Sequence, residues 1–193
     1  MKVRSIALAL SLAVFGLAGC VAITPVPAGP LALGANRQAT LDRNWSDVTA
    51  LVSPGVKSVR VLSIDGPYLN RLYLVQGLTA GQSLLKAASK ERPVPKFQAG
   101  MSLTEQVELI ADSVSAIGYQ RVETQGLRPG RFGPADGVRF EIAAMTDQGL
   151  EISGTAEVAV VEGRLYAVIY LAPKEHYFGA SLPNIEALLA SVS

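Results

Sequence analysis

The sequence predicts an α+β fold in which a single antiparallel sheet is packed by at least two helices. Residues 138–144, 150–161 and 164–172 have the composition of strands and are joined by short turns, which indicates a C-terminal antiparallel meander. Residues 103–117 carry apolar side chains at the spacing of one helical stripe, and a second such stripe closes the chain.

The first half of the globular part is predicted to contain a hairpin. Residues 56–64 are rich in valine and isoleucine, and a second strand at residues 69–75 follows the turn signal Asp65-Gly66-Pro67. Trp45, the only tryptophan, is expected to fill the core. Residues 83–90 are expected to form a short helix, which nearby prolines end.

The clearest helix follows Ser102. Ser102 and Glu105 have the spacing of a capping box, and Gly118 stands where a helix ends. The apolar stripe consists of Leu103, Val107, Ile110, Val114 and Ile117. The opposite side is charged, so we expect this helix to cover one face of the sheet.

The second half is predicted to continue with strands. Residues 119–124 are expected to be a strand, whereas residues 125–137 contain so much glycine and proline that an irregular loop is expected. Residues 164–172 are apolar on both faces, which indicates a central strand covered on both sides. Ser181 is expected to cap the final helix, with Pro183 in its first turn.

The end of the chain is an apolar strand, an aromatic loop and a short helix finishing in Ala190-Ser191-Val192-Ser193. This ending is similar to that of the PsbP-like α/β/α sandwich. The resemblance covers only the end of the chain and implies helices on both faces of the sheet.

The N-terminal segment has the pattern of a secretory signal. Lys2 and Arg4 precede an apolar run over residues 6–17, which is too short to span a bilayer. The run ends in Leu17-Ala18-Gly19-Cys20, which resembles the lipobox of bacterial lipoproteins. The resemblance implies that the Cys20 thiol carries a diacylglyceryl group as a thioether, with palmitate among its acyl chains. The alternative is an ordinary cleaved signal followed by an incidental free cysteine or by a buried structural one. Val21 stands where an aspartate would retain the protein in the inner membrane, so the resemblance implies sorting to the outer membrane.

The expected organisation is therefore a signal peptide at 1–19, a lipid-anchored flexible tether at 20–38 and an α+β domain at 39–193. The tether region is uncharged and rich in proline and glycine. The alternative for this region is an N-terminal strand that pairs with the sheet. On the tether hypothesis, a chain that starts at Ala39 should fold.

Composition excludes several classes of function. The chain has 17 basic and 16 acidic residues, and losing Lys2 and Arg4 with the signal leaves a net charge of −1. Such a balance argues against nucleic acid as a partner. One cysteine and one histidine cannot build a disulfide, a thiolate metal site or a histidine cluster, and no cofactor motif is present.

The sequence nominates no catalytic residue. Ser83 and Lys86 match the spacing of an S-x-x-K acylation motif, but its companion motifs do not follow. His176 is the only histidine, and no serine is nominated as its partner.

The candidate ligand surface has two parts. Arginines cluster in sequence around the glycine-rich segment, and guanidinium groups suit anionic partners. These residues are Arg121, Arg128, Arg131 and Arg139. His176 and Tyr177 follow the central strand and are a second candidate rim. The alternatives are charges that protect an edge strand from aggregation and aromatic residues that only cover the sheet.

We therefore expect a non-enzymatic, membrane-tethered binding module that faces the periplasm. Its partner would be another envelope protein or an anionic envelope component. The alternatives are an envelope hydrolase or transferase whose site only the fold assembles, and an accessory subunit of a transport or assembly complex.

Overall fold

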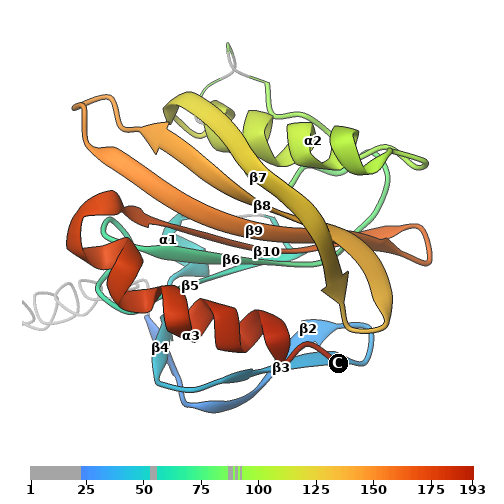
Figure 1. Ribbon diagram of the computed structural model, residues 1–193, viewed down its shortest axis with the longest axis horizontal. Helices are drawn as coiled ribbons and strands as arrows, with labels where there is room; N and C mark the ends of the chain where they lie inside the picture. Colours follow the sequence, from blue (N-terminus) through green and yellow to red (C-terminus); the bar gives the residue numbers. More distant parts are fainter. Residues whose placement is uncertain (1–22, 53–55, 87–88, 90, 92) are drawn as a thin grey trace, which may run out of the picture.

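The computed structural model describes residues 23–52, 56–86, 89, 91 and 93–193, and it has three layers (Figure 1). The middle layer is an eight-stranded sheet in which all neighbouring strands are antiparallel. In spatial order its strands are β1 (Thr24–Val26), β4 (Trp45–Asp47), β5 (Val59–Ser63), β6 (Arg71–Leu78), β10 (Arg164–Pro173), β9 (Glu151–Val161), β8 (Ala135–Met145) and β7 (Gln120–Phe132). The short helix α1 (Thr49–Val52) follows β4.

Helix α2 (Leu103–Ala116) covers one face of the sheet. Its capping box is confirmed, because the Ser102 Oγ accepts from the Glu105 N–H and the Glu105 carboxylate accepts from the Ser102 N–H at 2.7 Å. Val107, Ile110 and Val114 are buried against the sheet as predicted. Leu103 is 49% exposed, because it is the first residue of the helix and does not reach the sheet.

The other face is covered by the hairpin of β2 (Gly29–Gly34) and β3 (Arg37–Leu41) together with α3 (Gly179–Ala190). Trp45 is buried in this core, as expected. The irregular turn η1 (Lys174–Phe178) leads from β10 into α3. Hairpin and helix cover β5, β6 and β10, whose side chains on this face include Leu72, Leu74 and Tyr170.

The predicted hairpin, meander and central strand are confirmed. β5 pairs with β6, and β8, β9 and β10 follow one another in the sheet. β10 lies between β6 and β9, and it is buried on both faces. Leu165, Ala167 and Ile169 face the α2 core, whereas Tyr166 and Val168 face the α3 core.

The prediction of a flexible tether through residue 38 is wrong for the part that the structure describes. Leu31 and Leu33 are buried in the α3-side core, and the β2–β3 turn places Ala35 and Asn36 at positive φ. The Gln76 Nε2 also donates to the Ala32 carbonyl at 2.8 Å. The folded domain therefore includes Thr24 onward, whereas the predicted signal peptide at 1–19 and the predicted lipidation site Cys20 lie outside the described residues.

The structure also differs from three local predictions. The segment 125–137 is not a loop: it contains the end of β7, a turn at Gly133 and the start of β8. Gly126 lies at a β-bulge of this edge strand, since the register shifts beside it and its φ is +63°. The expected helix at 83–90 is not found in its described residues.

The final helix begins earlier than predicted. α3 starts at Gly179, so Ser181 is a buried residue inside the first turn and does not cap the helix. Pro183 is the fifth residue of α3, beyond the first turn in which it is predicted, and its missing N–H removes one hydrogen bond within the helix.

Within the described residues, no helix combines the length and the apolar character that a membrane crossing requires.

Candidate functional site

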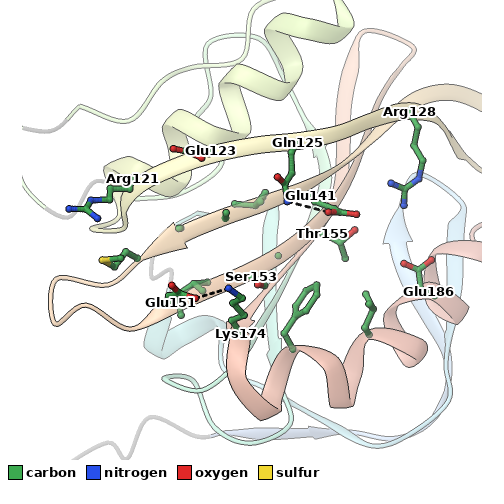
Figure 2. A pocket seen from close by; sticks show the side chains of 18 residues that line it. Arg121, Glu123, Gln125, Arg128, Glu141, Glu151, Ser153, Thr155, Lys174 and Glu186 are labelled. Atoms are coloured by element: carbon green, nitrogen blue, oxygen red, sulfur yellow. Dashed lines mark hydrogen bonds and ion pairs between the residues drawn. The ribbon is translucent and has the colours of Figure 1, made fainter.

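One half of the sheet is left uncovered on the α3 side. Here the faces of β7, β8 and β9 form a groove of about 440 Å³ between the β7 edge and α3 (Figure 2). Ten of its eighteen lining residues are polar or charged, including Glu141 of β8 and Thr155 of β9 on this face, whereas Ile142 belongs to the α2 core.

The floor of the groove follows from the pairing of β8 with β9. Glu141 lies opposite Thr155, and Ala143 lies opposite Ser153. The small side chains of Ala143 and Ser153 leave the middle of the floor low. The floor is therefore a trough that runs along the strands, with Glu141 and Thr155 at one end.

The rims carry charges of both signs. Arg121, Glu123, Gln125 and Arg128 of β7 form one rim, and Lys174, Phe178, Leu182 and Glu186 form the other. At one end, the Lys174 Nζ lies 2.8 Å from the Glu151 Oε2. This hydrogen-bonded ion pair lowers the pKa of Glu151 and raises the pKa of Lys174.

At the other end, a buried ion cluster supports the groove. Arg139 lies opposite Glu157 in the β8–β9 register, and its guanidinium also forms an ion pair with Glu186 of α3. Burial raises the pKa of the Glu157 carboxyl, although the Arg139 guanidinium acts to lower it. β7 passes directly over this cluster, since a Cβ on Gly130 would lie 3.2 Å from the Glu157 side chain.

Several buried polar atoms at this end have no hydrogen-bond partner. Thr155 lines the groove and is only 3% exposed, yet its Oγ1 makes no hydrogen bond to the described residues. The Glu157 Oε1 and the Arg139 Nε also have no partner, but these two residues lie beneath β7 and do not line the groove. Buried polar atoms in folded proteins are normally satisfied, so the Thr155 hydroxyl is an unused hydrogen-bonding group at this end of the groove.

The structure separates the four arginines that the sequence groups together. Arg121 and Arg128 line the groove, whereas Arg139 is buried beside Glu157. Arg131 is exposed and its Nη2 donates to the Pro134 carbonyl at 3.4 Å, away from the groove lining.

Acidic side chains outnumber basic ones in the groove. Arg121, Arg128 and Lys174 are the basic lining residues, and Glu123, Glu141, Glu151 and Glu186 are the acidic ones. The groove therefore lacks the cationic field that an anionic ligand needs.

His176 and Tyr177 lie on η1, between groove residues, but neither lines the groove. The two rings contact each other edge-on with centroids 5.1 Å apart. The Tyr177 carbonyl accepts from the Tyr170 hydroxyl at 3.5 Å, which ties η1 to the central strand. Their neighbours Lys174 and Phe178 form the rim instead.

The described residues contain no group of three or more histidine, cysteine, aspartate or glutamate side chains placed to hold a metal ion. Within the same residues, Ser153 in the groove has no hydrogen bond to a basic side chain that could activate it. Ser83 and Lys86, the S-x-x-K pair, lie in an irregular segment rather than on a helix.

Sequence reasoning missed the polar floor. Glu151, Ser153, Thr155 and Glu157 recur in β9 at a spacing of two residues, which places all four on one face. That spacing was the available signal, and Glu141 joins them only through the strand register.

The sequence matches no protein-family model and no curated protein. Among solved structures, the chain is similar to the cyanobacterial PsbP (CyanoP) of Synechocystis sp. PCC 6803, at 12% sequence identity and a TM-score of 0.53. The similarity covers 94% of this chain and 98% of the other. The described chain thus has a PsbP-like fold, which confirms the resemblance at its C-terminal end and extends it over the domain.

Proposed function

We propose that this protein is a non-enzymatic binding module of the cell envelope, and that its ligand occupies the groove between β7 and α3. The observation that carries this proposal is the buried Thr155 hydroxyl, which lines the groove and has no partner among the described residues. A buried hydroxyl left unpaired destabilises a protein, so its presence in a groove favours a role in binding.

The proposal includes a lipid anchor on Cys20, in the outer membrane, with the domain facing the periplasm. Only residues 21–23 separate Cys20 from β1. Four peptide units reach at most about 14 Å. The β1 edge of an anchored domain would therefore lie close to the bilayer.

This anchoring is compatible with a groove that remains accessible. β1 and β7 are the two opposite edges of the eight-stranded sheet. At ~4.8 Å per strand, the β7 edge lies ~34 Å across the sheet from the anchored edge. The groove would then be open to another envelope protein or to a component of the envelope.

Photo-crosslinking in living cells tests the proposal. A photoreactive amino acid replaces Gln125 on the groove rim, and a matched variant carries it at Glu108, an exposed position of α2 on the other face. We expect an adduct of defined mass at position 125 and none at position 108. Equal labelling at both positions, or no adduct at 125, would contradict a binding role for the groove.

A further inference from the structure

We infer that the groove binds a neutral, hydroxyl-rich chain, which is an oligosaccharide. This inference rests on the proposed function, because it names the chemical class of ligand for the same groove. Three features support it: the mixture of hydrogen-bond donors and acceptors in the lining, the balance of charge and the shape of the trough.

The polar groups that line the groove include both acceptors and donors. The Glu141 carboxylate is an acceptor, the Arg128 guanidinium is a donor, and the unpartnered Thr155 Oγ1 can act as either. A phosphate or a carboxylate group would satisfy only the donors, and an ammonium group only the acceptors. Hydroxyl groups both donate and accept, so a ligand with several hydroxyls can complete such a set.

Thr155 is the residue that we expect to contact the ligand directly. It lines the groove, whereas Glu157 lies two residues further along the same face of β9. Glu141 stands opposite Thr155, and Arg128 and Glu186 approach from the two rims (Figure 2). A sugar hydroxyl at this end would therefore meet carboxylate, guanidinium and hydroxyl groups together.

The charge of the lining disfavours strongly charged ligands. Three basic and four acidic side chains alternate around the trough, so a polyanion would meet carboxylates and a polycation would meet arginines. Like charges brought together in this way oppose binding. A neutral ligand avoids both conflicts.

The trough has room for an extended ligand. Arg121 and Arg128 mark its ends on β7, and seven residues of bulged strand span roughly 20 Å. Phe178 and Leu182 provide an apolar strip along the α3 rim, on which the C–H face of a sugar ring can pack.

The experiment is a titration of the folded domain, residues 23–193, followed by amide chemical shifts. The probes are maltotetraose and chitotetraose as neutral sugars, polygalacturonate as a polyanion and tetralysine as a polycation. We expect a neutral sugar to shift amides of β8, β9 and α3 around the groove, and the charged probes to leave them unchanged. Thr155→Val should weaken this binding about tenfold, the effect of one lost hydrogen bond.

A matched variant controls for the substitution itself. Thr124→Val makes the same change on β7, opposite Ile142 and so on the α2 face, and should leave the affinity unchanged. If neither sugar shifts the groove, or if Thr155→Val binds as wild type does, the inference is overturned. Groove shifts with tetralysine or polygalacturonate alone would overturn the sugar class while leaving the binding role intact. Failure of the Gln125 crosslink would count against the binding role itself.

Discussion

Arg139 on β8 lies directly opposite Glu157 on β9, with its Nη1 4.0 Å from the Glu157 Oε2. The two side chains are only 13% and 5% exposed. The same guanidinium reaches Glu186, so one buried arginine joins the sheet to α3 at the end of the groove.

Replacing Arg139 should be strongly destabilising. Arg139→Met leaves the Glu157 carboxylate buried without its cation, which costs about 3–5 kcal/mol of unfolding free energy. Urea denaturation measures this change. The double variant Arg139→Met/Glu157→Gln should recover a large part of the loss, because no unpaired buried charge remains. Strictly additive effects of the two changes would show that the residues do not interact.

Glu157→Gln should change how stability depends on pH. Burial raises the pKa of the Glu157 carboxyl above its usual 4.5. The folded protein then holds this proton more tightly than the unfolded chain does. Glu157 therefore contributes to the stability of the fold below about pH 4.5, and this contribution is lost as the pH rises through the raised pKa. We expect the variant to gain stability relative to wild type between about pH 4 and pH 7.

Urea titrations across this range test that expectation. Glu108→Gln on the exposed side of α2 controls for the change in net charge. A Glu157→Gln variant that loses stability relative to wild type on going to higher pH would contradict the sign of the shift.

Thr155→Val should make the protein more stable while it weakens binding. The buried Oγ1 has no partner among the described residues, so an isosteric methyl group removes a desolvation penalty of about 1–3 kcal/mol. Thermal unfolding monitored by circular dichroism measures the gain, with Thr124→Val as the matched change on the other face. A clear loss of stability in Thr155→Val would show that the hydroxyl serves the fold.

Deleting the first strands should unfold the domain or nearly so. A chain that starts at Ala39 lacks the buried side chains of Val26, Leu31 and Leu33. At about 1.5–3 kcal/mol each, their loss removes about 5–9 kcal/mol, which is comparable to the whole stability of a typical domain. A chain that starts at Ile23 keeps these residues and should melt cooperatively. Equal melting temperatures for the two chains would contradict the structural role of β1 and β2.

Cys20→Ser tests the proposed anchor. Without the thiol there is no atom to carry the thioether lipid, so we expect an uncleaved precursor without label after growth with radioactive palmitate. Gel mobility and autoradiography of the immunoprecipitated protein report both properties. Unchanged labelling of the variant would refute the anchor.

Sequence reasoning succeeded where the pattern is local. The capping box at Ser102 and Glu105 and the apolar stripe of α2 lie within a few turns of one helix, so neighbouring residues specify them. The two apolar faces of β10 likewise indicate a strand covered on both sides.

It failed where composition suggested a loop and tertiary contacts overrode it. β2 is rich in glycine and proline, yet the alternation of Leu31 and Leu33 lets it bury one face against the sheet. β7 contains Gly126 at a bulge and Pro129 in regular register, and an edge strand tolerates both because one side of its backbone has no partner strand.

The sequence alone determined the α+β class, the central strand and the strand faces, since periodicity and turn residues act over short distances. Only the tertiary structure decided the groove. The β8–β9 register sets Glu141 against Thr155 and Arg139 against Glu157, and the path of α3 brings Glu186 to the same place. Strand register and helix docking are set by packing between residues far apart in the chain, so no local pattern could have placed these side chains together.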